Sequence, residues 1–154
     1  MFVLLKQLSD IRRRAGLTRP PGGPGALQLR HVDAGSCNAC ESELHATANP
    51  LHDLSRHGMS ITASPRHADV LLVTGPVTTR MAPALRRAYD AMSEPRIVAA
   101  LGDCALGCGF FASSPDVVGR LEDVLPVDVR IPGCPPDPET IVRHLLPLLH
   151  PPAR

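Results

Sequence analysis

The chain has 154 residues, of which 44% are hydrophobic, so it is long enough to form one domain with a substantial core. Aromatic residues make up only 3% of the chain and the formal net charge is +1, which argues against a nucleic-acid platform of interleaved basic and aromatic side chains. The sequence contains neither a run of about 20 apolar residues that could span a bilayer nor the order of charges typical of a secretion signal. We therefore expect a reducing cytoplasmic setting, in which thiols stay free.

Basic residues gather at the start of the chain. Residues 1–31 contain six basic side chains and one acidic side chain, a net charge of +5, whereas the remainder contains ten basic and fourteen acidic side chains, a net charge of −4. Apolar residues at near-helical spacing predict an amphipathic helix over residues 2–14, and the Pro- and Gly-rich residues 18–25 predict a linker. We expect residues 1–25 to form a basic arm that docks on a lipid surface or an acidic protein, although a solvated leader gives the same pattern.

From residue 26 onward, strand and helix patterns alternate. The apolar run ADVLLVT is typical of a central parallel strand that is covered on both faces. Asn38 with Glu41 has the form of a capping pair that opens a helix, and Asp137 with Pro138 has the form of an N-cap and first helical residue. The alternation predicts an α/β domain over residues 26–154, with a mostly parallel sheet between two layers of helices. We expect strands at 26–32, 59–63 (an edge strand), 68–74, 97–101 and 127–131, and helices at 39–56 (interrupted near residue 50), 81–92, 115–125 and 138–149.

Four cysteines directly follow predicted strands. Cys37 and Cys40 follow the first strand, Cys104 the fourth and Cys134 the fifth. The carboxyl ends of parallel strands lie at one edge of a sheet, where α/β proteins bind their ligands, so the four thiols are expected to meet there. The C-x-x-C pair also enters a helix, whose positive end favours thiolates. The pattern therefore predicts a metal site and not a disulfide framework.

The spacing of these cysteines leaves three kinds of site open. A thioredoxin-like redox pair at Cys37 and Cys40 would leave the other two cysteines without a role. A structural Zn(Cys)₄ site is chemically reasonable, but zinc sites more often use two closely spaced pairs. Ligands that are dispersed along the chain and gathered by the fold suit a [4Fe–4S] cluster at least as well.

Three stretches of the chain resemble one protein family when they are read together: GSCNACESELHATANPLHDLSRHGMSITASPRHADVLLVTGPVT, MAPALRRAYDAMSEPRIVAALGDC and VLPVDVRIPGCPP. They are similar, over residues 34–149, to the [4Fe–4S]-bearing B-type subunit of respiratory complex I and of the membrane-bound [NiFe]-hydrogenases. SCNACESE followed by SPRHAD is especially similar to the formate hydrogenlyase form. The separation of Cys37 from Cys40 also resembles the hydrogenase branch, because complex I proper has adjacent cysteines at this place.

The resemblance implies a flavodoxin-like fold and one [4Fe–4S] cluster with Cys37, Cys40, Cys104 and Cys134 as its ligands. It implies an electron-transfer subunit of an oxidoreductase, without a complete active site of its own, at the cytoplasmic face of the cell membrane. The implied partners are a large hydrogenase-type subunit similar to the D-type subunit of complex I, a ferredoxin-like iron–sulfur subunit and a membrane subunit that receives the arm, with no nucleic acid. The alternatives are a complex I type that passes electrons to quinone and, in another class, a structural Zn(Cys)₄ protein.

Two glutamates and a fifth cysteine lie near the predicted ligands in the sequence. Glu43 matches an acidic position of the family, so we expect it to tune the cluster or relay protons. Glu41 is expected only to favour the first helical turn electrostatically. Cys108 stands where the family usually has glycine, and we interpret it as a spare buried thiol and not as a ligand; the alternative is a ligand close to Cys104.

Overall fold

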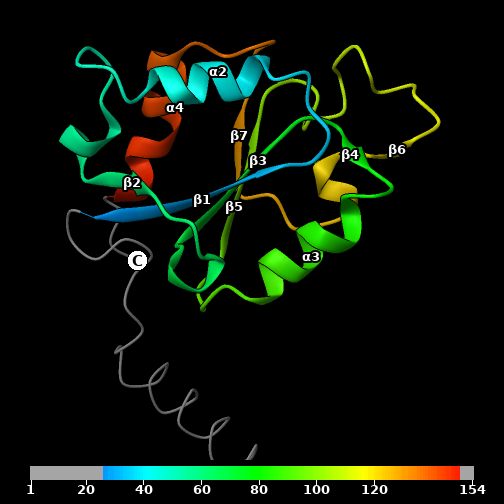
Figure 1. The fold of residues 1–154 in the computed structure, drawn as a ribbon, viewed down its shortest axis with the longest axis horizontal. Helices are drawn as coiled ribbons and strands as arrows, with labels where there is room; N and C mark the ends of the chain where they lie inside the picture. The colour runs from blue at the N-terminus through cyan, green and yellow to red at the C-terminus, as the bar shows by residue number, and fades with distance from the viewer. Residues whose placement is uncertain (1–25, 150–154) are drawn as a thin grey trace, which may run out of the picture.

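The computed structural model describes residues 26–149, and the predicted basic arm lies outside this range. In the described residues, five parallel strands form one sheet in the order β2-β1-β3-β5-β7 (Figure 1). Counted along the chain, this is the 2-1-3-4-5 order of flavodoxin-like folds. The predicted α/β class and its mostly parallel sheet are therefore confirmed. The strands are β1 (Leu27–Asp33), β2 (Met59–Ile61), β3 (Val70–Thr74), β5 (Ile97–Leu101) and β7 (Val129–Ile131).

The position of each strand follows from its side chains. β3 lies at the centre, pairs with β1 and β5 over all five of its residues, and has all five side chains buried. Such burial on both faces explains why its sequence is almost continuously apolar. β2 has only three residues, pairs with β1 alone and leaves Ile61 exposed, so it is the predicted edge strand.

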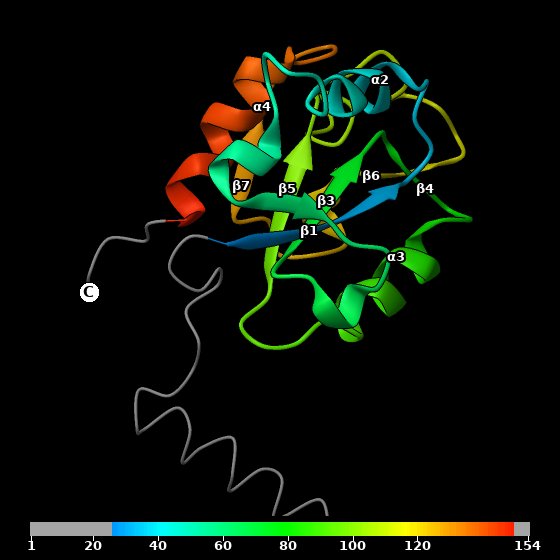
Figure 2. The same cartoon turned by 60° about the vertical axis from the view of Figure 1, so that its left-hand side comes forward.

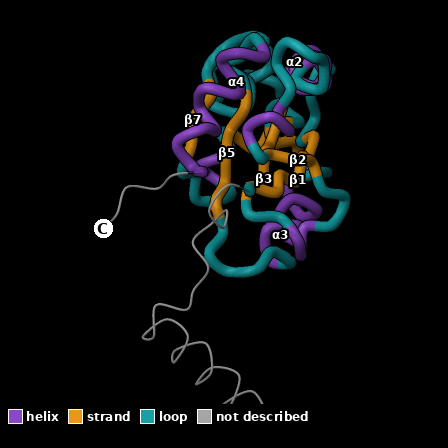
Figure 3. Tube along the Cα trace, turned by 90° about the vertical axis from the view of Figure 1, so that its left-hand side faces the viewer, coloured by secondary structure: helices purple, strands orange, loops and turns teal. Residues whose placement is uncertain are grey.

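Helices cover both faces of the sheet (Figures 1 and 2). α2 (Ala39–Ala46) and α4 (Pro138–Leu145) share one core cluster with Leu72 of β3. α3 (Ala82–Asp90) packs on the other face, where its Leu85 joins Leu71. The end-on view in Figure 3 shows the strands between these helices. The predicted three-layer arrangement is therefore present.

The last helix begins and ends where the sequence predicts. The side chain of Asp137 accepts a hydrogen bond from the Thr140 amide at 2.7 Å and caps α4, and Pro138 occupies the first helical position. A 3₁₀ helix over Leu146–Leu149 continues the last turn to the predicted end. Among residues 26–149, no helix is long and apolar enough to cross a bilayer.

Two predicted helices are wrong in part. The helix expected over residues 39–56 ends at Ala46, and a separate 3₁₀ turn, Leu54–His57, follows it. The helix expected over residues 115–125 is replaced by β6 (Val117–Gly119) and a 3₁₀ turn. β6 pairs in antiparallel fashion with β4 (Val77–Thr78), about forty residues earlier in the chain. This distant partner overrides the local helical spacing of the apolar residues.

Candidate metal centre

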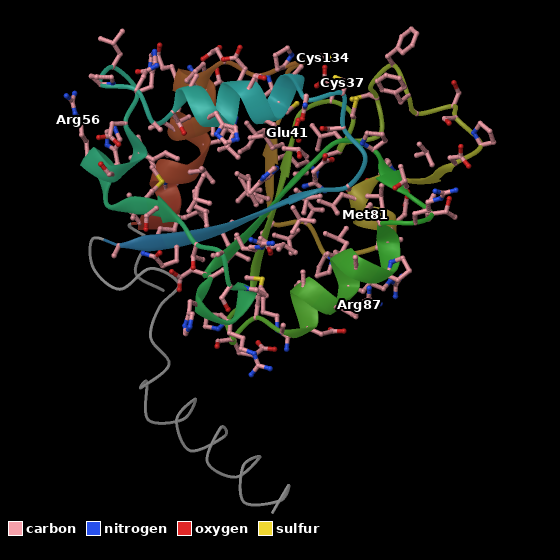
Figure 4. The ribbon with its side chains drawn as sticks, in the orientation of Figure 1. Cys37, Glu41, Arg56, Met81, Arg87 and Cys134 are labelled. Atoms are coloured by element: carbon pink, nitrogen blue, oxygen red, sulfur yellow. The ribbon has the colours of Figure 1, made fainter. Side chains whose placement is uncertain are left out.

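Three loops at the carboxyl edge of the sheet bear the four predicted cysteines. The loop after β1 carries Cys37 and leads to Cys40 in the first turn of α2, while Cys104 follows β5 and Cys134 follows β7. Figure 4 places Cys37 and Cys134 at the same end of the molecule. β1, β3, β5 and β7 are consecutive neighbours in the sheet. Their carboxyl ends therefore bring cysteines from different loops, which are 30 to 97 positions apart in the chain, to the same edge of the sheet.

Cys40 and Cys104 have pKa values that are shifted by burial and by the other thiols. Burial, with smaller contributions from the charges of Glu41, Cys104, Cys37 and Cys134, raises the pKa of Cys40 to about 12. Burial also raises the pKa of Cys104, and Cys134 and Cys37 add to this effect. The structure thus places the four cysteines on neighbouring loops at the carboxyl edge of the sheet, and their role as ligands stays a prediction.

The surroundings of the thiols differ from one to the next. Cys40 is buried, Cys104 is half-buried, and Cys37 and Cys134 are exposed. A hydrogen bond from the Phe111 amide to the Cys104 sulfur opposes the effect of burial on the pKa of Cys104. A set of one buried thiol and three thiols that reach the surface could hold a group that lies at the surface edge of the domain.

Gly102 allows the loop after β5 to lie directly on Cys40. Its φ of +89° belongs to a region that side-chain-bearing residues rarely adopt, and a Cβ placed on it would lie 2.5 Å from the Cys40 sulfur. The space beside this sulfur therefore depends on the absence of a side chain at position 102.

Backbone hydrogen bonds join the loops after β5 and β7. The Gly102 amide donates to the Ile131 carbonyl at 2.8 Å, and the Asp103 amide donates to the Gly133 carbonyl at 2.9 Å. The Gly133 amide in turn donates to the Asp103 carboxylate at 2.8 Å. These bonds fix Cys104 and Cys134, which directly follow Asp103 and Gly133, in one rigid arrangement.

The C-x-x-C loop has its own set of hydrogen bonds. The Asp33 carboxylate accepts from the amides of Gly35 and Ser36, both at 2.7 Å. Asn38 adopts a left-handed conformation with φ of +71° and makes no side-chain cap to α2, so the capping role predicted for it is wrong. Its amide donates to the Ser36 hydroxyl at 3.1 Å, which forms a tight turn around Cys37.

Glu41 is the site residue whose position the sequence interpretation missed. It is only 8% exposed, whereas Glu43, the predicted functional carboxylate, is half-buried. The Glu41 carboxylate accepts hydrogen bonds from the hydroxyls of Ser36, at 2.6 Å, and Thr74. The hydroxyl at position 74, which ends an otherwise apolar central strand, was the sequence signal for a buried polar partner.

Cys108 lies on the loop after Cys104. Its thiol is exposed and donates a weak hydrogen bond to the Asp103 carbonyl at 3.5 Å. The interpretation of Cys108 as a buried thiol is therefore wrong, because the Gly-rich segment around it turns the side chain to the surface.

The chemistry of these side chains bears on the group that they could hold. Within residues 26–149, no three His, Cys, Asp or Glu side chains are grouped closely enough to hold one metal ion. A single zinc ion takes four ligands at about 2.0–2.3 Å, whereas each of the four cysteines of a [4Fe–4S] cluster binds a different iron. Four thiols are a donor set that fits a [4Fe–4S] cluster.

Sequence comparisons identify relatives over most of the described chain. The family described as "NADH ubiquinone oxidoreductase, 20 Kd subunit" matches residues 37–148. The chain is 46% identical over 112 residues to the probable membrane-bound hydrogenase subunit mbhJ of Pyrococcus furiosus, which covers 73% of this chain and 67% of that protein. It is also 46% identical over 115 residues to the uncharacterized protein MJ0516 of Methanocaldococcus jannaschii, which covers 75% and 77%.

Solved structures share the fold. A chain of the membrane-bound sulfane sulfur reductase, an archaeal respiratory membrane complex, matches with a TM-score of 0.69 at 28% identity, over 82% of this chain and 71% of that one. A chain of an NAD⁺-reducing [NiFe]-hydrogenase matches with a TM-score of 0.65 over 84% and 98%, and at 20% identity this likeness shows the fold alone. The chain therefore belongs to the NADH ubiquinone oxidoreductase 20 kDa subunit family of oxidoreductase subunits.

Proposed function

We propose that this protein carries one [4Fe–4S] cluster on Cys37, Cys40, Cys104 and Cys134 and serves as an electron-transfer subunit of a membrane-associated hydrogenase complex. The observation that carries this proposal is the placement of four cysteines on three loops at the carboxyl edge of the sheet, after the neighbouring strands β1, β5 and β7 and in the first turn of α2. Such a cluster supplies one-electron transfer at a potential that its surroundings set.

The protein's own residues prepare the site for this group. The Phe111 amide donates to the Cys104 sulfur, and hydrogen bonds to sulfur are among the factors that tune a cluster's potential. Burial of Cys40 keeps its thiol protonated near neutral pH, so iron binding releases that proton. The joined loops after β5 and β7 hold two of the ligands at a fixed spacing.

The hydrogenase assignment is favoured over the quinone-reducing one. The relative from Pyrococcus furiosus is described as a probable membrane-bound hydrogenase subunit. Two residues separate Cys37 from Cys40, a spacing that resembles the hydrogenase branch. In this proposal the partners are a large hydrogenase-type subunit and a ferredoxin-like iron–sulfur subunit, in a complex of the formate hydrogenlyase type. Residues 1–25 would hold it at the cytoplasmic face of the membrane through a membrane subunit.

Metal analysis of the protein purified under anaerobic conditions tests the cluster. We expect a brown protein with about four irons and four sulfides per chain. Cys134→Ser should lose this signal and weaken folding, because metal binding and folding are coupled. Cys108→Ser is the matched control and should keep the cluster. A colourless protein that holds one zinc would support the structural Zn(Cys)₄ alternative instead.

Two further variants test the roles of Glu43 and the arm. Glu43→Gln should keep the cluster and slow turnover of the assembled complex if the carboxylate relays protons to the partner's site. Deletion of residues 1–20 should release the complex from membranes with the cluster retained. Unchanged membrane association would contradict the docking role of the arm.

A further inference from the structure

A buried carboxylate lies beside the proposed cluster with a full set of hydrogen-bond donors. Glu41 directly follows Cys40 and is 8% exposed. One of its oxygens accepts from the Ser36 hydroxyl at 2.6 Å, and the other accepts from the Thr74 hydroxyl. His31 extends the network, because its Nε2 lies 2.9 Å from the Thr74 hydroxyl and 3.7 Å from the carboxylate.

This network is more than a favourable charge in a first helical turn. A surface carboxylate would supply that effect without the cost of desolvation, which is large for a buried charge unless it is paired and hydrogen-bonded. Glu139 shows the ordinary arrangement, since it lies in the first turn of α4 and is exposed. The burial of Glu41 therefore requires an explanation from the structure around it.

The contacts of Glu41 enclose the C-x-x-C segment. Ser36 directly precedes Cys37, and Glu41 directly follows Cys40, so the hydrogen bond between them closes the loop that bears both thiols. Thr74 is the last residue of the central strand, and its bond to the same carboxylate ties the closed loop to the rigid centre of the sheet.

The charge of Glu41 is held close to the neighbouring cysteine. Glu41 directly follows Cys40 in the first turn of α2, and its bonds to Ser36 and Thr74 fix the carboxylate beside the segment that bears both thiols. The other charged or titratable groups around the network are Asp33, Arg30 and His45, which influence His31. A negative charge fixed this close to a cluster opposes the arrival of an electron, which lowers the reduction potential.

We propose that Glu41 is a positioning residue, which holds the Cys37–Cys40 segment on the end of β3 and lowers the reduction potential of the cluster by its charge. This role rests on the proposed function, because it requires that the cluster be bound. It differs from the role of Glu43, which lacks this enclosed set of contacts.

The test measures cluster potential and cluster retention in the purified holoprotein. Glu41→Gln keeps the shape and removes the charge, so an EPR-monitored redox titration should show a higher potential than wild type. Glu139→Gln removes the same charge at the exposed position on α4 and should leave the potential unchanged. Thr74→Val and Ser36→Ala keep the charge, but each removes one hydrogen bond to the carboxylate together with the second contact of the same hydroxyl, to His31 or to the Asn38 amide. Both should lose iron to a chelator faster than wild type.

The outcomes separate the two proposals. If Glu41→Gln keeps the wild-type potential, or if Thr74→Val and Ser36→Ala keep the wild-type rate of iron loss, the positioning role is refuted while the cluster stands. If wild type binds zinc and no iron, the proposed function fails and this role fails with it. Should Glu41→Gln not retain a cluster, the two hydroxyl variants decide the outcome through their rates of iron loss.

Discussion

A methyl group at Gly102 is expected to displace a cluster ligand. The new Cβ would lie 2.5 Å from the Cys40 sulfur, whereas ordinary contact begins at 3.4 Å, so the sulfur must retreat by about 0.9 Å. It has little room to do so, because Cys40 is buried, and the Gly133 carbonyl lies 3.4 Å from the same Cβ on another side. The φ of +89° adds about 1–2 kcal/mol of backbone strain for a residue with a side chain.

Gly58→Ala provides the matched control for Gly102→Ala. Gly58 also has a positive φ, +75°, but it directly precedes β2 and so lies at the amino end of the strands, away from the cysteines. Gly58→Ala should therefore lower the free energy of unfolding by about 1–2 kcal/mol and keep the full iron content. Gly102→Ala should lower it further and lose iron, as measured by anaerobic urea unfolding and metal analysis. Wild-type iron content in Gly102→Ala, with no greater destabilisation than in Gly58→Ala, would refute the packing argument.

Two further predictions concern the core and the pH dependence of stability. Leu72→Ala, in fully buried β3, should lower the free energy of unfolding in urea by about 2–5 kcal/mol. Leu51→Ala, at an 84% exposed position, should change it by at most about 0.5 kcal/mol, and an equal loss in both would contradict the described core. Burial lowers the pKa of His31, so between that value and its unfolded pKa of about 6.5 the unfolded chain binds more protons. Stability should therefore fall as the pH drops through this window, and His31→Gln should reduce the fall in urea titrations at a series of pH values.

The fold and the placement of the four cysteines after neighbouring strands could be predicted because both depend on local patterns. The continuous apolar run at residues 68–74 identifies the central strand, and its pairing on both sides places the neighbouring strands. Once the strands are parallel, their carboxyl ends share one edge, and the thiols that follow them have to lie there. Neither step requires knowledge of a distant contact.

Other features depend on contacts that no local pattern reports. Residues 117–119 form a strand because Val77 and Thr78 lie beside them, and Gly119 breaks the helical pattern with a φ of +149°. The role of Glu41 depends on a hydroxyl 33 positions away at Thr74. The capping role predicted for Asn38 is wrong for a different reason, since its left-handed backbone departs from the extended conformation that a capping residue typically adopts.

The paired backbone bonds between Asp103 and Gly133 limit where this chain can gain or lose residues. An insertion between the end of β5 and Cys104, or between the end of β7 and Cys134, would shift the sulfurs of both cysteines, because the two loops are hydrogen-bonded to each other. The mostly exposed residues 112–116 lie outside this link. Variation in length is therefore expected to be tolerated there and excluded from the two short turns beside the cysteines.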